Sequence, residues 1–351
     1  MADELELLRA NQLVGPIRLD KNENAYGPSE KAIEATRTGL SLANRYPNGE
    51  YERLAEKIAG LNHVKTEQVT LGAGSREILR MAATTYLAGG KKLILASPTF
   101  DPIVHFAEMM GVEIVAIPLN KTYGHDLEAM LARADRSTGL VYVCNPNNPT
   151  GSLTPRKALE AFLEKLPSGC AVLIDEAYHH YVEGVSEYAS FLDRPIDDPR
   201  LVVIRTFSKI YGLAGLRVAY AISTPRAARS LFSSQLQWGV SPIAARAAEA
   251  ALDDADHVRL SAKRNTDDRQ EFYNRANGLM LRSIDSHTNF VLMKTGLPST
   301  EVIEHFKNHN VLIGPRVPQM EKYVRISLGK PEEMQEFWRV CELLPPHAME
   351  M

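Results

Sequence analysis

The chain has 351 residues, of which 44% are hydrophobic and 24% are charged, proportions that are ordinary for a globular protein. A net charge of -3 at pH 7 gives no electrostatic case for binding nucleic acid or an anionic membrane. Three scattered cysteines, Cys144, Cys170 and Cys341, are too few for a disulfide framework or a zinc site. No stretch approaches the ~20 apolar residues of a membrane span, and the acidic N-terminus lacks a secretory pattern. We therefore expect a cytoplasmic protein, although an export signal already removed would leave no trace.

Short apolar runs alternate with helical periodicity up to Ser241. Most runs are continuously apolar, which is typical of strands covered on both faces. Helices between such strands imply parallel crossovers, and hence an α/β fold with a doubly wound, mostly parallel, seven-stranded sheet. Ligands bind such sheets at the carboxyl ends of the strands. The predicted strands are 68–71, 92–96, 113–117, 140–144, 171–174, 201–205 and 218–222, and the predicted helices are 75–87, 102–110, 155–166 and 225–235.

The pattern changes after Ser241. A long helical region at 242–278 precedes a mixture of shorter elements, which predicts a smaller α+β lobe with a meandering sheet. Its predicted strands are 289–293, 311–313 and 323–328, and its predicted helices lie near 300–309 and 332–344. We expect an N-terminal segment at 1–40 that packs with this lobe, a large domain at 41–275 and a small domain at 276–351.

A glycine-rich turn joins the first predicted strand to the helix that follows it. Backbone N–H groups in such a turn, together with the positive end of the helix, suit an anion such as a phosphate. Alone the signal is weak, because turns of this kind are common, and Glu77 stands where a dinucleotide site would have its third glycine. The residues that would face the anion are Ala73, Gly74, Ser75 and Arg76.

Two later strand ends supply an amide, a carboxylate and a phenol. In Asn145-Pro-Asn-Asn-Pro-Thr-Gly151 two prolines restrict the backbone around Asn148, whose side chain can then be held in one direction. Asp175 ends a run of apolar residues, where an unpaired carboxylate would be costly, so it needs a cationic partner. A protonated pyridine nitrogen would serve, and Tyr178 could donate a hydrogen bond to a phenolate oxygen on the same ring.

Lys209 follows the predicted strand at 201–205 in a polar, glycine-rich turn. A lysine shielded by neighbouring aromatic rings at the edge of a sheet loses its proton more easily than a solvated lysine, which makes Lys209 a candidate Schiff-base nucleophile. For an isolated lysine a surface position would be the better explanation. Three residues around it, Thr206, Ser208 and Arg217, again suit a phosphate.

Together these groups describe a pocket for pyridoxal 5'-phosphate. Lys209 would form the Schiff base and later shuttle a proton, and Asp175 would keep the ring nitrogen positive so that the ring can accept electrons. Phe100, after the predicted strand at 92–96, would stack against the ring face.

The motifs 145–151 and 175–178, with Lys209 and Arg217, resemble those of the fold-type I, class I/II aminotransferases over nearly the whole chain. Within that superfamily the chain most resembles the histidinol-phosphate aminotransferases. The residues that carry this closer resemblance are Leu19-Asp-Lys-Asn-Glu-Asn24, Tyr26-Gly-Pro28, Arg45-Tyr-Pro47 and Arg325-Ile-Ser-Leu-Gly329.

The resemblance implies a role for each of these residues. It makes Lys209 the lysine bonded to the cofactor, pairs Asp175 with the pyridine nitrogen, and places Asn148 and Tyr178 on the ring hydroxyl. It implies that Tyr46 reaches the cofactor phosphate of a second subunit, so that a homodimer shares its active sites. The residues that would hold the phosphate are Ala73, Gly74, Ser75, Thr206, Ser208 and Arg217.

The same resemblance implies a substrate site at Arg325, which takes a polar end of the substrate, with Asn24, Tyr26, Asn148 and Arg316 as further candidates. Two departures bear on the substrate. Gly314 stands where these enzymes typically carry an arginine, which displaces Arg316 by two positions, and the N-terminal segment lacks the Pro-Tyr element that often closes the site.

We therefore predict an aminotransferase that uses an amino donor and a 2-oxo acid, with L-histidinol phosphate and 2-oxoglutarate as the specific pair. The alternatives are an aromatic or broad-range aminotransferase, or another reaction of the cofactor such as decarboxylation or oxidation. A regulatory sensor of the same fold would need a DNA-binding module before Tyr46, for which the chain has too few residues. We predict no metal site, although His305 and His309 stand one helical turn apart.

Overall fold

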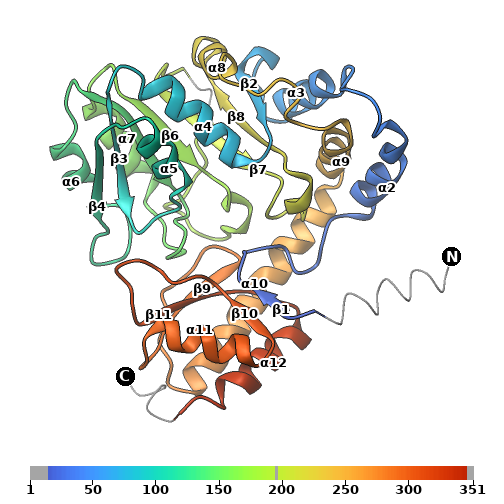
Figure 1. Cartoon of the computed structure of the whole chain (residues 1–351), viewed down its shortest axis with the longest axis vertical. Helices are drawn as coiled ribbons and strands as arrows, with labels where there is room; N and C mark the ends of the chain where they lie inside the picture. Colours follow the sequence, from blue (N-terminus) through green and yellow to red (C-terminus); the bar gives the residue numbers. More distant parts are fainter. Residues whose placement is uncertain (1–14, 194–196, 346–351) are drawn as a thin grey trace.

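The structure is a computed structural model that describes residues 15–193 and 197–345. Its larger lobe is built on a seven-stranded sheet (Figure 1). The strand order is β2-β8-β7-β6-β5-β3-β4, and β8 is antiparallel to both neighbours while all other neighbours run parallel. The predicted mostly parallel sheet is therefore confirmed. Its strands are β2 (Val69–Gly72), β3 (Lys92–Ser97), β4 (Ile114–Pro118), β5 (Thr138–Cys144), β6 (Ala171–Asp175), β7 (Leu201–Thr206) and β8 (Ala219–Ser223).

Two hydrophobic cores, one on each face of the sheet, explain the uninterrupted apolar runs. Every residue of β5, β6 and β7 is buried. Along β5, Val141 and Val143 belong to one core, whereas Leu140 and Tyr142 belong to the other. The helices of this lobe are α2 (Glu30–Gly39), α3 (Glu50–Leu61), α4 (Ser75–Tyr86), α5 (Pro102–Met109), α6 (Leu127–Ala132), α7 (Arg156–Lys165), α8 (Pro225–Phe232) and α9 (Pro242–Leu252).

The single helical region predicted at 242–278 is wrong, because the structure contains two helices there. After α9 the chain turns, and α10 (Ala255–Gly278) begins. Asp254 caps the new helix by accepting a hydrogen bond from the His257 N–H at 3.3 Å. Aspartate favours such a cap over a helix interior, which is why the chain breaks at this point.

The smaller lobe holds a third hydrophobic core between short sheets and helices α11 (Ser299–Asn308) and α12 (Pro331–Cys341). In place of the predicted single meander, the described part of this lobe contains two sheets. The antiparallel pair is β9 (Phe290–Lys294) with β11 (Tyr323–Ser327), and the parallel pair is β1 (Ile17–Leu19) with β10 (Val311–Ile313). Because β10 pairs with a strand from the beginning of the chain, it does not extend the β9–β11 pair.

The N-terminal segment runs from the smaller lobe to the larger one (Figure 1). After β1 the chain passes the edge of the large sheet and then forms α2, which packs on α9. We retain the division into 1–40, 41–275 and 276–351 as a proposal, in which α10 runs across the second boundary. The first 14 residues and the last six lie outside the described residues. Among the helices of the described residues, none combines the length and the apolar character needed to cross a membrane.

Candidate active site

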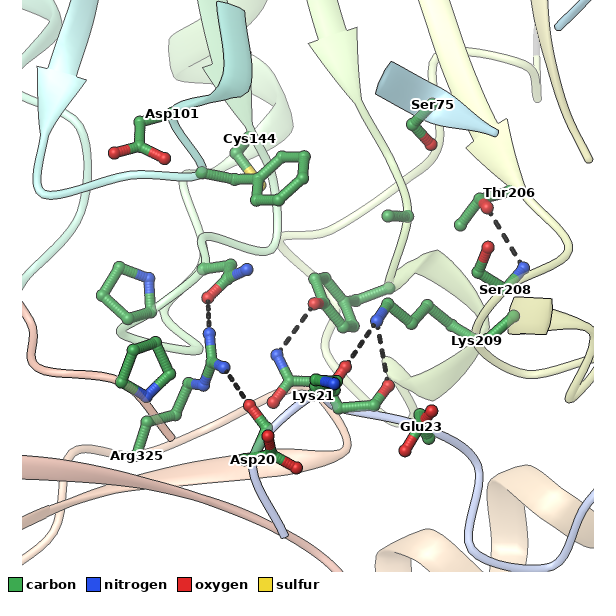
Figure 2. A pocket seen from close by; sticks show the side chains of 18 of the residues that line it. Asp20, Lys21, Glu23, Ser75, Asp101, Cys144, Thr206, Ser208, Lys209 and Arg325 are labelled. Carbon is green, nitrogen blue, oxygen red and sulfur yellow. Dashed lines mark hydrogen bonds between the residues drawn. The ribbon is translucent and has the colours of Figure 1, made fainter. Parts of the chain in front are cut away.

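A cavity of about 860 Å³ lies where the carboxyl ends of the parallel strands face the smaller lobe. The large sheet supplies the residues on one side, and the N-terminal segment and β11 supply those on the other (Figure 2). Residues that were predicted from separate strand ends, and two arginines that were predicted from the family resemblance, therefore line one cavity. They are Ser75, Arg76, Phe100, Asn148, Asp175, Tyr178, Thr206, Ser208, Lys209, Arg217, Arg316 and Arg325.

The Lys209 amine points from the turn after β7 toward the N-terminal segment (Figure 2). Its Nζ donates hydrogen bonds to the main-chain oxygens of Lys21, at 3.1 Å, and Asn22, at 3.0 Å. Burial lowers the pKa of Lys209 to about 8, and the positive charge of Arg325 acts in the same direction. A neutral, nucleophilic amine is therefore accessible near neutral pH.

Asp175, at the carboxyl end of β6, is 1% exposed. Its carboxylate accepts hydrogen bonds from the Tyr142 hydroxyl at 3.0 Å and from the Ala177 N–H at 3.1 Å. Burial raises the pKa of Asp175 to about 6, against the lowering effect of the Tyr142 hydrogen bond. Within the described residues this carboxylate forms no ion pair, so it is a buried acid that a cationic ligand would stabilise.

Asn148 and Tyr178, from the large sheet, are oriented by partners on the other side of the cavity, Arg325 and Asn22. Arg325 Nη1 donates to Asn148 Oδ1 at 2.7 Å, so the amide nitrogen is the group that Asn148 can offer to a ligand. Tyr178, also buried, accepts a hydrogen bond at its hydroxyl oxygen from Asn22 Nδ2 at 3.0 Å. Burial raises the pKa of Tyr178 above that of a free tyrosine, so its hydroxyl keeps its proton. Asn148 and Tyr178 are thus hydrogen-bond donors toward the cavity.

Arg325, on β11, is held by two hydrogen bonds, but not all of its N–H groups have a partner. Its Nη2 donates to the main-chain oxygen of Asp20 at 2.6 Å, while its buried Nε has no hydrogen-bond partner among the described residues. Gly314 makes room for it, because a Cβ at that position would lie 3.1 Å from Arg325 Nε and 2.7 Å from Arg325 O. An arginine at position 314 would therefore collide with Arg325 in this backbone.

An anion cradle lies between the beginning of α4 and the turn after β7. Gly74 has φ +74, and a Cβ there would lie 2.1 Å from Arg217 Nη2, so only glycine lets this guanidinium approach the turn. Among the residues that the structure describes, no side chain caps the N-terminus of α4. Arg217 Nη1 donates to Ser208 Oγ at 3.3 Å, and the Ser208 N–H donates to Thr206 Oγ1 at 3.1 Å. Free helix N–H groups, hydroxyls and a guanidinium are suited to a phosphate.

Glu77, at the position where a dinucleotide site would have glycine, has a structural role. Its side chain is buried and accepts hydrogen bonds from the N–H groups of Ala73 and Leu236. The Ala73 N–H is thus taken by Glu77, and the Gly74 N–H donates to the Gly72 oxygen at 2.8 Å, so the predicted anion contacts through these two N–H groups are not available in this geometry, and neither residue lines the cavity.

Two predicted substrate residues, Asn24 and Tyr26, lie outside the cavity. Asn24 Nδ2 donates to the main-chain oxygen of Ile210 at 2.9 Å, and the Tyr26 hydroxyl donates to Asp268 Oδ2 at 2.8 Å. Both side chains anchor the N-terminal segment to the larger lobe and to α10. Within this chain neither side chain reaches the cavity, and their substrate role stays a prediction.

Tyr46 also lies away from the cavity within this chain. Its side chain is 73% exposed, and its ring packs against that of Trp238 with centroids 4.3 Å apart.

Arg316 does line the cavity, but from an exposed loop, where its Nη2 lies 3.7 Å from Glu321 Oε1. It stands three residues after the end of β10, two positions beyond Gly314, at the solvent-exposed side of the cavity.

Sequence reasoning missed two contributors, Asn22 and Tyr142. Asn22 contacts both Tyr178 and Lys209, and its place in the 19–24 motif was the signal that could have identified it. Tyr142 lies inside an apolar strand and gave no signal.

His305 and His309 each bond to a main-chain oxygen, and the described residues contain no cluster of His, Cys, Asp and Glu suited to a metal ion.

Comparisons with known proteins agree with this arrangement. The sequence model of aminotransferase class I and II matches residues 14–340. Histidinol-phosphate aminotransferase 2 of Pseudomonas aeruginosa is 38% identical over 322 residues, which are 92% of this chain and 87% of that protein. The histidinol-phosphate aminotransferase of Symbiobacterium thermophilum is 34% identical, over 92% of this chain and 88% of its own.

Similarity extends to solved structures. The histidinol-phosphate aminotransferase of Sinorhizobium meliloti in complex with pyridoxal-5'-phosphate matches with a TM-score of 0.87 at 27% identity, covering 95% of this chain and 90% of that one. The chain therefore belongs to the class I and II aminotransferases and, among these, to the histidinol-phosphate aminotransferase family.

Proposed function

We propose that this protein is a pyridoxal-phosphate-dependent aminotransferase that converts L-histidinol phosphate and 2-oxoglutarate into imidazole acetol phosphate and L-glutamate. The observation that carries the proposal is the convergence of Lys209, Asp175 and the anion cradle on one cavity. The family of the chain supports the reaction, and the names of its relatives support the substrate. An aromatic or broad-range aminotransferase, or a decarboxylase or oxidase, remains the alternative.

The residues of the cavity fit pyridoxal phosphate. Asp175 is a buried carboxylate without a cationic partner among the described residues, and a protonated pyridine nitrogen would supply one. The cradle of Ser75, Ser208 and Arg217 would hold the phosphate. The Arg217 guanidinium can reach this cradle because it occupies the space that a Cβ at Gly74 would fill. Phe100 would cover one face of the ring.

The chain contributes position, charge and proton transfer. When bound, the cofactor supplies an electron-poor ring that accepts the electron pair left by the departing α-hydrogen. Lys209 would hold the cofactor covalently and, once released by the incoming amine, would move the proton from the substrate α-carbon as a general base. Asp175 would keep the ring nitrogen protonated, and Asn148 with Tyr178 would donate hydrogen bonds to the ring oxygen.

Arg325 is the proposed contact for the anionic end of both substrates. Its guanidinium lines the cavity, and Nη1 and Nη2 each carry a second N–H besides the one donated to Asn148 or Asp20, so it can pair with the phosphate of histidinol phosphate and, in the second half reaction, with a carboxylate of the oxo acid. Arg316 would add a weaker, solvent-screened attraction at the exposed side.

We also propose a homodimer with shared sites. Tyr46, Leu236 and Trp238 are large hydrophobic side chains that are 73%, 55% and 52% exposed, and Arg45 and Tyr46 line a second hollow together with Arg246 of α9. An exposed aromatic surface of this kind suits a second copy of the chain, whose cradle Tyr46 would reach.

We further infer a cytoplasmic enzyme of histidine biosynthesis. The names of the relatives support the pathway. The three cysteines are free and buried, which fits a reducing compartment.

The proposal is tested by single half reactions of the purified protein with its cofactor. L-histidinol phosphate, L-phenylalanine, L-glutamate and L-arginine are each added alone, and loss of the cofactor absorbance is followed with time. We expect histidinol phosphate to react with the highest kcat/KM and glutamate to be the other efficient donor. A higher kcat/KM for phenylalanine would show that the enzyme is an aromatic aminotransferase, and release of carbon dioxide from an amino acid would show a decarboxylase.

A further inference from the structure

Asn22 lies at the centre of a hydrogen-bond network that joins the N-terminal segment to both lobes. Its side chain is 2% exposed, and its φ of +53 is in the left-handed region, which asparagine tolerates better than most residues. It lies between β1 and α2, in the segment that lines the cavity. Hydrogen bonds to both lobes hold this buried asparagine in place.

The orientation of the Asn22 amide follows from its contacts with Ser327. The Asn22 N–H donates to Ser327 Oγ at 2.8 Å. The Ser327 hydroxyl in turn donates to Asn22 Oδ1 at 3.0 Å. Because Oδ1 is occupied as an acceptor on the Ser327 side, the amide nitrogen must face the other way, toward the Tyr178 oxygen at 3.0 Å.

This orientation determines what Tyr178 can offer to a ligand. Asn22 Nδ2 has no lone pair to accept with, so the Tyr178 oxygen is the acceptor in their hydrogen bond. The phenolic O–H is then directed elsewhere, and Tyr178 lines the cavity. Arg325 fixes Asn148 in the same way, because the guanidinium donates to Asn148 Oδ1 and leaves the amide nitrogen for the ligand. Both side chains therefore present donors, as an anionic ring oxygen requires.

The Asn22 main chain also contacts the site, through its carbonyl oxygen. Its carbonyl oxygen accepts a hydrogen bond from Lys209 Nζ at 3.0 Å and another from Asn289 Nδ2 at 3.1 Å. Asn289 precedes β9 and is 3% exposed, so the carbonyl is fixed from the smaller lobe. One residue of the N-terminal segment thus touches both the phenol and the amine of the site.

We propose that Asn22 is a positioning residue of the reaction, which holds Tyr178 with its hydroxyl proton directed at the phenolate oxygen of the cofactor. This proposal rests on the proposed use of pyridoxal phosphate, but not on the identity of the amino donor. Ser327 acts through Asn22, as the group that prevents the amide from rotating by half a turn.

The test is the pH titration of the absorbance of the bound cofactor, which does not depend on turnover. A hydrogen bond donated to the phenolate withdraws electron density from it, so the phenolate attracts the neighbouring imine proton less strongly. Asn22→Ala should weaken that donation and raise the midpoint of the titration by about half to one pH unit. Ser327→Ala should raise it in the same direction by a smaller amount, and it replaces Asn22→Ala if that variant does not fold.

Coupling to Tyr178 separates this role from a merely structural one. In the Tyr178→Phe background, Asn22→Ala should change the midpoint by less than about 0.3 pH units, because the hydroxyl that it orients is gone. Asn24→Ala is the matched control, since Asn24 anchors the same segment through Ile210 O without touching Tyr178, and its midpoint should equal that of the wild type.

The outcomes are distinguishable from failure of the proposed function. An equal shift of Asn22→Ala with and without the Tyr178 hydroxyl, an unchanged midpoint in Asn22→Ala, or an equal shift in Asn24→Ala would each overturn the role of Asn22. If the wild-type protein formed no coloured complex with pyridoxal phosphate, the proposed function itself would fail. If it formed the complex but did not react with histidinol phosphate, only the proposed substrate would be wrong.

Discussion

The Tyr142 hydroxyl donates a hydrogen bond to Asp175 Oδ2 at 3.0 Å across the neighbouring strands β5 and β6. The register pairs Asp175 with Cys144, so Tyr142 reaches the carboxylate diagonally on the same face of the sheet. Both residues are almost fully buried, at 0% and 1% exposure. A phenol embedded in the core thus stabilises the ionised form of the acid that the proposed mechanism needs.

Removing this hydroxyl should shift the pH dependence of cofactor binding. Burial already raises the pKa of Asp175 to about 6, and the Tyr142 hydrogen bond lowers it. Tyr142→Phe should raise that pKa by about a further unit, since a hydrogen bond to a charged group contributes about 1.5–3 kcal/mol. The loss of affinity for pyridoxal phosphate on acidification should then begin about one pH unit higher, as measured by absorbance titration from pH 5 to 8.

Tyr86→Phe is the control for this variant. The Tyr86 hydroxyl is buried but has no hydrogen-bond partner among the described residues, so its removal should leave the pH profile unchanged. An identical profile for Tyr142→Phe and the wild type would contradict the role of Tyr142.

Covalent capture of the cofactor by the apoprotein should report the lowered pKa of Lys209. With a pKa of about 8, the reactive neutral amine increases as pH rises and is nearly complete above pH 9. The capture rate should therefore rise about tenfold per pH unit below pH 7 and level off above pH 9, as followed by stopped-flow absorbance.

Borohydride reduction followed by peptide mapping should place the label on Lys209, and Lys209→Ala should form no covalent complex and lose turnover. The exposed Lys121→Ala should behave as the wild type. A rate that still rises tenfold between pH 9 and 10 would mean that Lys209 has the pKa of a solvated lysine.

The buried ion pair beside the site should be essential for stability. Arg205 and Glu176 are 9% and 2% exposed, and the Arg205 Nη2 atom lies 3.2 Å from Glu176 Oε2. Arg205→Met leaves Glu176 as an uncompensated buried carboxylate, which typically costs about 3–5 kcal/mol. Urea unfolding should show this loss.

Arg259→Met is the matched control for this prediction, since the side chains of Arg259 and Asp256 are 81% and 88% exposed. Its effect should stay below about 1 kcal/mol. If the two variants lost similar amounts of stability, the Arg205–Glu176 pair would not be a structural element of the site.

The two cavity arginines should differ in their effect on catalysis. Arg325→Gln removes a desolvated guanidinium, and loss of such a charge pair typically costs about 2–5 kcal/mol, so kcat/KM for histidinol phosphate should fall about 10²–10³-fold or more. Arg316→Gln removes an exposed charge and should lower kcat/KM by less than about tenfold, with an effect that shrinks as salt is raised. Equal losses in both variants would point to Arg316 as a principal contact.

Sharing of the sites predicts complementation between two defective subunits. A hybrid of one Lys209→Ala subunit and one Tyr46→Ala subunit contains one site with both native residues only if Tyr46 acts on the site of its partner. The purified hybrid should then bind pyridoxal phosphate with wild-type affinity at one site and retain about half of the wild-type kcat per dimer. An active monomer, or a hybrid no better than the Tyr46→Ala homodimer, would contradict shared sites.

Local sequence patterns were sufficient to predict the large sheet and its side of the site. Asp175 ends the apolar strand β6 and Lys209 follows the mostly apolar strand β7, and parallel strands bring such ends to one edge, so their convergence in the cavity could be predicted. Gly74 and Arg217 could be predicted as parts of an anion cradle for the same reason. These inferences needed only the period of the hydrophobic residues and the chemistry of each turn.

Only the tertiary structure decided which residues complete the site from elsewhere. Asn22 meets Tyr178 across 156 positions and Ser327 across 305, and no local pattern encodes contacts at such separations. The packing of one lobe on the other brought the N-terminal segment to the cavity and directed Asn24 and Tyr26 away from it. Tyr142 remained hidden because, in sequence, a strand phenol that binds an acid is indistinguishable from one that only fills the core. The sequence alone determined the chemistry of the cofactor side, because it follows strand ends, whereas the positioning network depends on how distant segments pack.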